Sequence, residues 1–305
     1  MASLDPGIGE KFSQPTQRAI NHDGSFNARR RGGPSVRDPY QRLILMPWGQ
    51  FFLEVGVLFG VLNAAFALAY MALGLEDLPG VAAPHGTWQD FLSALFFSIQ
   101  TFTSVGYGHV YPGSNGAGAL SSLEALVGVL TFALATGLLY GRFSRPTARI
   151  LFSHAAIVSR RPDGTPCLQF RVANRRANIL IELSARVIVK FTDPETQNFS
   201  YAAAALERDA VSFLPLTWTL VHDLGPDSPL HGLGPADYAA RAVEIIVMLK
   251  GYDDTFAQDV YARNSYIASE IAWHRRFRRA YDVDKTGTAV VDLDALDATE
   301  PLDDE

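Results

Sequence analysis

Two long apolar stretches constrain the fold of this chain more than any other feature of its sequence. Glu54 is the only charged residue of residues 51–73, and Glu124 is the only charged residue of residues 119–141. At a rise of about 1.5 Å per residue, a helix of roughly 20 residues crosses the hydrocarbon core of a bilayer. Both stretches are long enough, so we predict two transmembrane helices within a membrane domain of residues 49–141.

A shorter apolar segment and a loop with two glycines lie between the predicted spans. Residues 87–101 predict a helix that is too short to cross the membrane, with Thr87 as its N-cap and Asp90 three residues on. Irregular backbone at membrane depth must be buried in protein, because its polar groups cannot face lipid unpaired. We therefore expect a re-entrant helix followed by a buried loop.

The loop reads Ser104-Val105-Gly106-Tyr107-Gly108. It resembles the TVGYG loop of potassium channels, whose backbone carbonyls replace the hydration shell of the ion. Glycines at alternate positions permit backbone angles that other residues resist. One chain offers only one or two oxygens at each level, so four copies around one axis are implied. We expect potassium ions to bind at Ser104, Val105, Gly106 and Tyr107, with the Tyr107 ring packed outward.

Other interpretations of this loop stay open. Gly-Tyr-Gly alone is an ordinary turn, and its setting after a short helix and between two spans favours the filter. Ser104 stands where a threonine is commoner, so we expect selectivity to survive with altered affinity at the inner site. A less selective cation channel of the same plan is the alternative. A membrane-anchored binding protein is a further class, but it leaves the loop and the short helix unexplained.

Arginines are distributed unevenly around the spans. The loops between the spans contain neither Lys nor Arg. The arginines that flank the two spans are Arg29, Arg30, Arg31, Arg37 and Arg42 before the first, and Arg142, Arg145 and Arg149 after the second. By the positive-inside rule, both termini are cytoplasmic, which predicts a multi-pass protein of the cell inner (plasma) membrane.

The N-terminal residues carry no apolar core of a signal peptide. Residues 1–36 are polar and rich in breakers, and we expect a disordered cytoplasmic tail. Residues 37–48 mix basic, aromatic and aliphatic side chains, as at a membrane–water boundary. They predict a slide helix on the inner leaflet, although an ordinary amphipathic surface helix has the same pattern.

From residue 150 onward the apolar pattern changes to a period of two. Odd-numbered apolar residues over 179–191 alternate with polar ones, which predicts a long half-buried strand. Turn signals recur between short apolar runs, so residues 150–305 predict an all-β cytoplasmic sandwich after a basic linker of residues 142–149. One short helix is expected near residues 235–241. The formal net charge of -6 argues against nucleic-acid binding.

The second span carries candidates for a gate. Phe132 and Tyr140 recur on one slowly drifting helical stripe, and Tyr140 facing the axis would form a ring of aromatics at the inner mouth. Packing against lipid or another helix is the alternative. Gly128 and Gly137 are candidate hinges because glycine weakens a helix. Close helix packing explains glycines in membrane helices equally well.

Charged residues near the membrane suggest two further sites. Glu124 lies within the outer part of the second span, where a charge is costly. We expect it to be a buried partner of hydroxyls or amides that supports the filter. Arg142, Arg145 and Arg149 would attract anionic lipid headgroups at the inner leaflet, although they also serve as topology anchors.

Several motifs together resemble one family. These are Arg142-Phe143-Ser144-Arg145-Pro146, Arg171-Val172-Ala173-Asn174, the Trp218, His222, Asp227, Ser228, Pro229, Leu230 and Gly232 pattern, and Gln258, Ala262-Arg263, Ser265-Tyr266, Glu270-Ile271 and Trp273. They are similar to the inward-rectifier potassium channels, in particular the prokaryotic KirBac branch. The resemblance covers about residues 37–300.

The resemblance implies a non-enzymatic homotetramer whose immunoglobulin-like cytoplasmic domains extend a potassium pore. It implies a gate at Tyr140 and regulation by anionic phospholipids or phosphoinositides near the inner arginines. Phe132 occupies the position at which strong rectifiers of the family carry an acid, so we expect weak rectification. Gln100 and Val110 replace the Glu-Arg pair that braces the filter of eukaryotic relatives, which leaves Gln100 as a candidate filter support.

Overall fold

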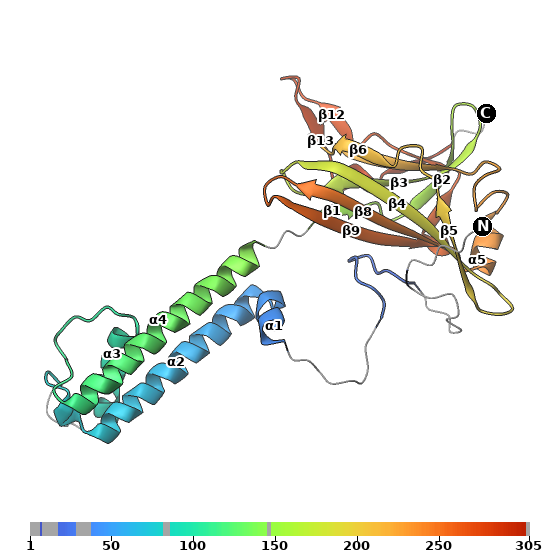
Figure 1. The fold of residues 1–305 in the computed structure, drawn as a ribbon. Helices are drawn as coiled ribbons and strands as arrows, with labels where there is room; N and C mark the ends of the chain where they lie inside the picture. Colours follow the sequence, from blue (N-terminus) through green and yellow to red (C-terminus); the bar gives the residue numbers. More distant parts are fainter. Residues whose placement is uncertain (1–6, 8–17, 29–37, 82–85, 145–147, 303–305) are drawn as a thin grey trace. The chain divides into compact units, whose positions relative to one another are not determined.

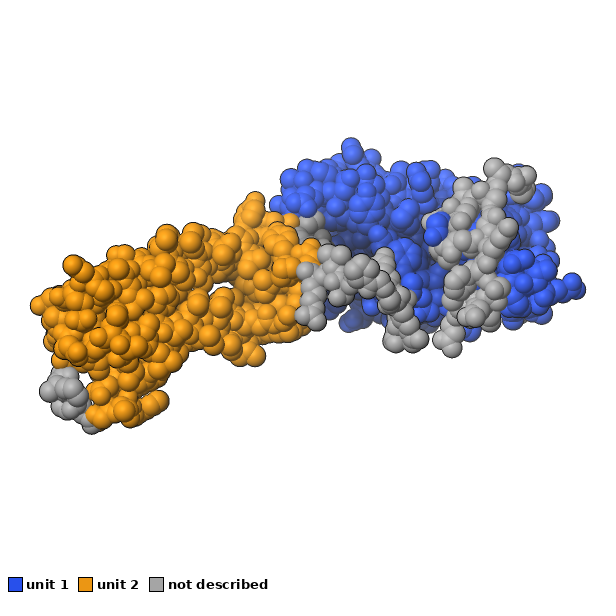
Figure 2. All heavy atoms as spheres, turned by 60° about the horizontal axis from the view of Figure 1, so that its bottom comes forward, with its two compact units in different colours: residues 1–31, 146–305 blue, residues 32–145 orange. Residues whose placement is uncertain are grey.

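The chain divides into two compact units, which are coloured separately in Figure 2. The computed structural model describes residues 7, 18–28, 38–81, 86–144 and 148–302. Residues 32–145 form a helical unit, and residues 1–31 join residues 146–305 in a unit built mainly from strands.

The described part of the helical unit contains four α-helices and one short 3-10 turn (Figure 1). They are α1 (Pro39–Leu45), α2 (Trp48–Leu73), η1 (Leu75–Asp77), α3 (Thr87–Phe102) and α4 (Asn115–Phe143). Helices α2 and α4 are long and apolar enough to cross a membrane, and few of their residues are buried within the chain. A core helix of a soluble protein would be mostly buried. Two membrane-capable helices with a short helix between them have the order of elements that the sequence predicted.

Helix α1 is shorter than the slide helix expected over residues 37–48. The Asp38 carboxylate caps it by accepting a hydrogen bond from the Gln41 amide at 3.1 Å. Pro47 cannot continue a helix with a normal backbone hydrogen bond, so α1 ends before it. Trp48 therefore begins α2 and does not belong to α1.

The start of α3 also differs from the prediction. Thr87 is the first helical residue, and Gly86 takes the cap position without a side-chain hydrogen bond. Helix α4 begins with ordinary capping chemistry, because the Ser114 hydroxyl accepts a hydrogen bond from the Ala117 amide at 3.1 Å.

Helix α3 packs against both long helices. Ala67, Ala94 and Ala117 are fully buried where α2, α3 and α4 meet. Small residues let membrane helices approach closely. The rings of Tyr70 and Phe97 meet edge to face beside them, with centroids 5.0 Å apart. This packing fixes the end of α3, and so the loop that follows it.

The second unit is a sandwich of two five-stranded sheets (Figure 1). The first sheet contains β1 (Ile150–Phe152), β2 (Ala156–Arg160), β3 (Pro166–Asn174), β7 (Thr217–Asp223) and β10 (Ile271–Trp273). The second contains β4 (Leu180–Thr192), β5 (Phe199–Ala204), β6 (Ala210–Phe213), β8 (Glu244–Asp253) and β9 (Gln258–Ile267). Pairing is antiparallel except between β2 and β10. Buried side chains from both sheets form one core, which confirms the predicted all-β sandwich.

Short elements complete this unit. They are α5 (Pro235–Ala240), η2 (Ala268–Glu270), η3 (Asp294–Asp297), β11 (Arg275–Phe277) paired with β14 (Thr299–Pro301), and β12 (Tyr281–Val283) paired with β13 (Ala289–Val291). Helix α5 confirms the helix expected near residues 235–241. His222 of β7 is buried, with its ring nitrogens 2.6 Å from the Ala205 carbonyl and 2.7 Å from the Ser228 hydroxyl, which is a structural role.

A bulge in β4 changes which side chains face the core. The alternation over residues 179–191 places Leu183 and Val187 inside, and both are buried. Ile179, expected on the same face, is 50% exposed. Glu182 has a φ of 50°, and the register against β8 shifts around it. An extra residue in one strand turns the side chains before it to the other face, so the prediction is wrong for the first residues of this strand.

Residues 18–28, the N-terminal segment, correct the prediction of a disordered tail over residues 1–36. An isolated bridge between Ile20 and Phe26 closes a tight turn. Ile20 is buried and packs against Ile246 of β8. The prediction failed here because most of the contacts of this segment are polar, and composition does not reveal them.

Candidate functional site

The loop after α3 is hydrogen-bonded to the end of that helix. The amides of Val105 and Gly106 both donate to the carbonyl of Gln100, at 3.0 and 3.3 Å. The Ser104 amide donates to the Thr101 carbonyl at 3.1 Å. These bonds satisfy carbonyls that a helix end leaves free. Gln100 thus contacts the loop through its main chain.

Every second residue of the loop has a left-handed backbone. The φ angles are 58° at Ser104, 53° at Gly106 and 79° at Gly108, whereas Val105 and Tyr107 between them have no positive φ. An extended chain with one sign of φ points its carbonyls alternately to two sides. Reversing the sign at every second residue turns successive carbonyls toward one side. This is the arrangement that a carbonyl-lined ion path needs.

Ser104 is the part of this pattern that the sequence did not predict. A left-handed backbone costs a non-glycine residue about 1 kcal/mol or more. Such conformations persist only where the surroundings enforce them, and they cluster at functional sites. Serine carries no sequence signal for this conformation, so the prediction covered only the two glycines.

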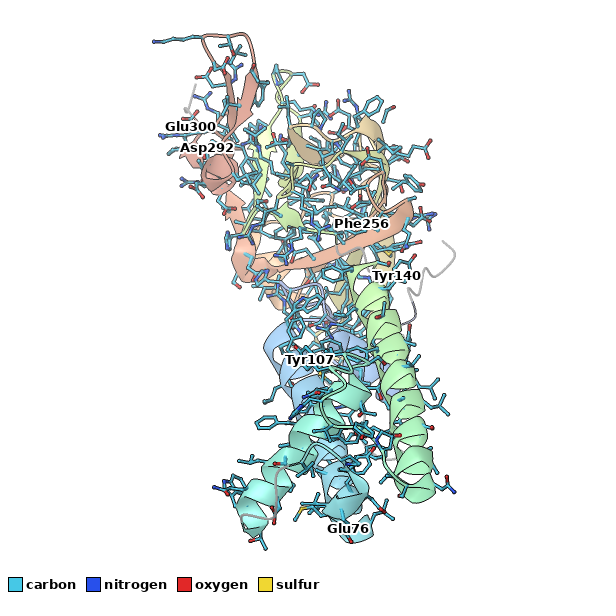
Figure 3. The ribbon with its side chains drawn as sticks, turned by 90° about the vertical axis from the view of Figure 1, so that its left-hand side faces the viewer. Glu76, Tyr107, Tyr140, Phe256, Asp292 and Glu300 are labelled. Atoms are coloured by element: carbon cyan, nitrogen blue, oxygen red, sulfur yellow. The ribbon has the colours of Figure 1, made fainter. Side chains whose placement is uncertain are left out.

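The loop exposes one side in the single chain. Val105 is 53% exposed and Tyr107 is 80% exposed, and a Cβ built on Gly106 or Gly108 meets no atom within 4 Å. Figure 3 shows Tyr107 on this loop, at a level between Glu76 at one end of the helical unit and Tyr140 at the other. The Val105 and Tyr107 side chains are thus largely uncovered in the single chain.

A buried polar cluster lies behind the loop and joins three helices. Glu124 of α4 is fully buried, and its carboxylate accepts hydrogen bonds from the Tyr70 hydroxyl at 2.7 Å and from the Ser98 hydroxyl. The Ser98 oxygen also lies 3.1 Å from the side-chain oxygen of Asn63. The sequence predicts a buried acid here with hydroxyl or amide partners, and in the structure the hydroxyls of Tyr70 and Ser98 contact it. Neither carried a signal of its own in the sequence.

The two candidate hinge glycines lie in different surroundings. A Cβ on Gly128 would lie 2.1 Å from the carbonyl oxygen of Phe102 at the end of α3. Gly128 is therefore a close-packing glycine, since no larger residue fits against that carbonyl. A Cβ on Gly137 meets no atom within 4 Å. Packing within the chain thus explains Gly128 and not Gly137.

The two candidate gate residues lie on exposed parts of α4. Phe132 is 50% exposed, and its ring centroid lies 6.2 Å from that of Phe102. Tyr140 is 74% exposed, near the end of the helix that is opposite to the end nearest Glu76. The Tyr140 ring is thus largely uncovered by the described part of the chain.

Arg142 is engaged by the protein. Its guanidinium donates to the carbonyls of Ile44 at 3.1 Å and Met46 at 2.7 Å, and also to that of Leu43. It stacks over the rings of Trp48 and Phe51, 4.4 and 4.6 Å from their centroids. Arginine suits this site because its planar group combines several donors with stacking on aromatic rings. The residue joins the end of α4 to the end of α1.

The other two arginines of the predicted lipid site are placed differently. Arg149 is exposed, and its carbonyl accepts a hydrogen bond from the Arg175 amide at 2.9 Å. Arg145 lies outside the described residues. Of the described pair, Arg149 is the one whose side chain is open to solvent.

Two family models match the chain. Residues 150–304 match the inward rectifier potassium channel C-terminal domain, and residues 56–145 match an ion-channel model. The inward rectifier potassium channel Kirbac3.1 of Paramagnetospirillum magnetotacticum is 34% identical over 282 residues, which cover 90% of this chain and 93% of that protein. The chain belongs to the inward rectifier potassium channel family.

Relatives from animals match this inward rectifier over a smaller part of their length. Human inward rectifier potassium channel 4 is 31% identical over 274 residues, which cover 79% of this chain and 60% of that protein. Human ATP-sensitive inward rectifier potassium channel 12 is 32% identical over 257 residues, covering 77% and 57%. Membership of this family makes the protein an ion channel and not an enzyme, and it confirms the fold class predicted from the sequence.

Proposed function

We propose that this inward rectifier conducts potassium passively through a selective filter at Ser104, Val105, Gly106 and Tyr107. The alternating left-handed backbone at Ser104, Gly106 and Gly108 carries the proposal, because it turns successive carbonyls to one side. Dehydrated potassium ions are the cargo that such carbonyls bind. The buried cluster around Glu124 and the main-chain bonds to Gln100 support the filter from behind.

The conducting form is a homotetramer. One chain lines only one side of an ion path, and closing the ring around a single ion requires a symmetric set of copies. The exposure of Val105 and Tyr107 in the single chain supports this assembly, since neighbouring chains would cover these side chains. The protein lies in the cell inner membrane with both termini in the cytoplasm, as the inner arginines favour.

Four Tyr140 rings form the gate, with Phe132 as a second constriction nearer the filter. The high exposure of Tyr140 in one chain supports this, because an axial ring must be free of intrachain contacts. Bending occurs at Gly137, where a Cβ would meet no described atom within 4 Å, and Gly128 packs against the end of α3. Apolar Phe132 at the cavity level gives weak rectification.

Anionic phospholipids or phosphoinositides regulate the channel through Arg149 and Arg145. Arg142 contributes differently, because its guanidinium is occupied by carbonyls and aromatic rings. It transmits movement of the slide helix α1 to the end of α4. Together with the cytoplasmic sandwich, this contact links lipid binding to the gate.

Rubidium uptake into proteoliposomes, driven by an internal potassium load, tests the proposed function. We expect barium-sensitive uptake that potassium competes for and sodium does not. Gly106→Ala should reduce uptake, because a side chain destabilises the left-handed backbone of a second residue of the loop by about 1 kcal/mol or more. Gly56→Ala, whose new methyl meets no atom within 4 Å, is the matched control. Equal competition by sodium would favour the less selective cation channel, for which Ser104 is the motivating residue. Absence of barium-sensitive uptake would refute conduction.

A further inference from the structure

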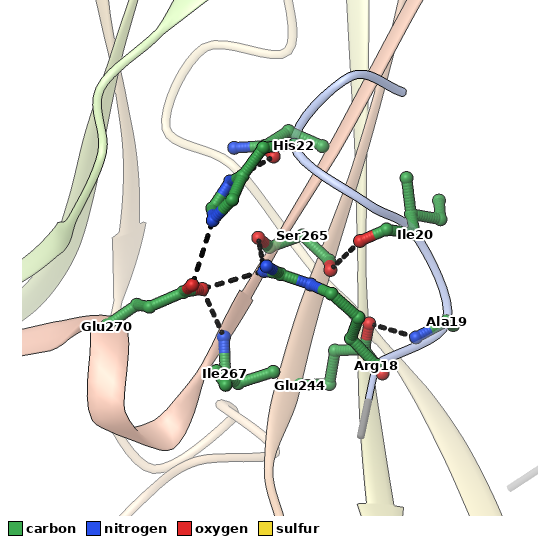
Figure 4. Close-up of polar contacts among 9 residues, drawn as sticks. Arg18, Ala19, Ile20, His22, Glu244, Ser265, Ile267 and Glu270 are labelled. Carbon is green, nitrogen blue, oxygen red and sulfur yellow. Dashed lines mark hydrogen bonds and ion pairs between the residues drawn. The ribbon is translucent and has the colours of Figure 1, made fainter. Parts of the chain in front are cut away.

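The N-terminal segment is held on the sandwich by main-chain and side-chain bonds (Figure 4). The Ala19 amide donates to the buried Glu244 carboxylate of β8 at 2.6 Å. The Ser265 hydroxyl of β9 donates to the Ile20 carbonyl at 2.7 Å. Arg18 donates to the Ser265 carbonyl at 2.8 Å. These contacts fix one end of the segment against β8 and β9.

The other anchor is Glu270 of η2. One of its carboxylate oxygens, Oε2, accepts from Arg18 Nη2 at 2.8 Å and from the Ile267 amide at 3.1 Å. The second oxygen, Oε1, lies 2.9 Å from Nε2 of His22. Figure 4 shows Arg18 and His22 approaching this carboxylate from the same segment.

His22 faces an acceptor with each of its ring nitrogens. Nδ1 lies 3.3 Å from Oδ1 of Asn264, and Nε2 lies 2.9 Å from Oε1 of Glu270. A neutral imidazole carries one N–H and can donate to only one of them, whereas an imidazolium donates to both. With the side-chain oxygen of Asn264 facing Nδ1, both contacts are hydrogen bonds only when the imidazole is protonated. Histidine is the side chain whose charge ordinarily changes between pH 5 and 8.

The charges that surround the histidine keep their signs over that range. Arg18 shares Glu270 with it, and Arg263 of β9 stacks over Phe26 with its guanidinium 5.3 Å from the ring centroid. Hydrogen bonds from Ser25 hold the pKa of the Asp23 carboxyl below its ordinary value, so it stays ionised. The buried Lys190–Glu244 pair, at 3.3 Å, lies deeper in the sandwich.

We propose that the N-terminal segment is a proton-stabilised clip, held on the cytoplasmic sandwich by a protonated His22 that bridges Asn264 and Glu270. Lowering the pH adds the second donor and a charge opposite to Glu270, so the clip binds more tightly. Raising the pH leaves one acceptor without its hydrogen bond, and the clip loosens.

The clip sets the length of chain available to the slide helix. Residues 29–37 alone separate the N-terminal segment from Asp38, the cap of α1, and extended chain of that length spans at most roughly 30 Å. Release of the clip adds residues 18–28 to this tether.

Hydrogen exchange of the full-length tetramer in lipid nanodiscs tests the proposal without any need for conduction. Protection of the amides of residues 18–28 is measured at pH 5.5 and pH 8 and divided by the intrinsic exchange rate at each pH. His22 is half exposed, so we expect about fivefold higher protection at the lower pH. In His22→Gln, whose amide donates from one nitrogen only, protection should be equal at both pH values and near that of the wild type at pH 8.

His154→Gln is the matched control. His154 is also exposed and also contacts a carboxylate, that of Asp297, but it lies outside the clip. This variant should keep the pH dependence of the wild type, whereas Glu270→Gln should lose it. Equal protection in the wild type at both pH values overturns the proposal. A pH dependence that survives in His22→Gln overturns it as well.

Discussion

Gly128→Ala and Gly137→Ala form a matched pair that tests how α4 packs on the end of α3. Replacing glycine by alanine inside a helix stabilises it by about 1 kcal/mol through helix propensity, and this gain is common to both variants. At Gly137 the new methyl meets no atom within 4 Å, so only the gain remains. Gly137→Ala should therefore stabilise the tetramer.

At Gly128 the new methyl would lie 2.1 Å from the Phe102 carbonyl oxygen and 3.0 Å from its carbonyl carbon. Side-chain Cβ atoms do not approach other atoms within 3.0 Å, so the backbone of one helix must move by about 1 Å. Overpacking of this kind costs about 1–3 kcal/mol, and a rigid carbonyl favours the upper part of that range. The stability of Gly128→Ala should therefore be lower than that of Gly137→Ala by this amount.

The assay is the apparent melting temperature of each tetramer in the same detergent. It is obtained from the fraction of tetramer that size-exclusion chromatography detects after heating. Rubidium uptake gives a second measurement. Gly128→Ala should melt lower and lose uptake, because the displaced carbonyl lies two residues before Ser104. Gly137→Ala should melt higher, with slower gating. Equal melting temperatures would refute the packing argument for Gly128.

Three further predictions concern other residues. Tyr70→Phe removes the hydroxyl that donates to the buried Glu124 carboxylate. We expect it to lower tetramer stability by about 1–2 kcal/mol and to reduce rubidium uptake. Unchanged stability would contradict the hydrogen-bonded cluster. Arg142→Gln keeps a hydrogen-bond donor but loses the stacking on Trp48. We therefore expect lipid to change rubidium uptake several-fold less in this variant than in the wild type. An unaltered lipid response would contradict the coupling of α1 to α4 through Arg142. Burial raises the pKa of the Cys167 thiol, so we expect maleimide to label it only after unfolding. Rapid labelling of the native tetramer at pH 7 would contradict its burial.

The elements that the sequence predicted well are those with a long-range pattern. The two spans, the short helix between them and the strands of the sandwich all follow from hydrophobic length or period. The filter loop followed from a resemblance, supported by its setting. Glu124 was predicted because a charge within a span demands a buried partner.

The features that were missed arise from contacts across the fold. Ser104 adopts a left-handed backbone that only its surroundings enforce, and Glu182 forms a bulge that no local signal marks. The sequence predicts lipid binding at Arg142, because a basic residue beside a span usually faces headgroups, but it carries no signal for the three carbonyls of the α1–α2 junction that accept its hydrogen bonds. The N-terminal segment has the composition of a tail and is ordered by polar partners far away in the sequence. Sequence pattern does not encode such partners.

The contact of Arg142 with the end of α1 has a consequence for how the protein responds to bilayer thickness. Helix α4 has 29 residues, so it is about 43 Å long and exceeds a hydrocarbon core of about 30 Å. Such a helix accommodates a thinner or thicker bilayer by changing its tilt. Because Arg142 fastens its inner end to α1, a change of tilt carries the interfacial helix with it. We therefore expect membrane thickness to act mechanically on the inner mouth of this channel.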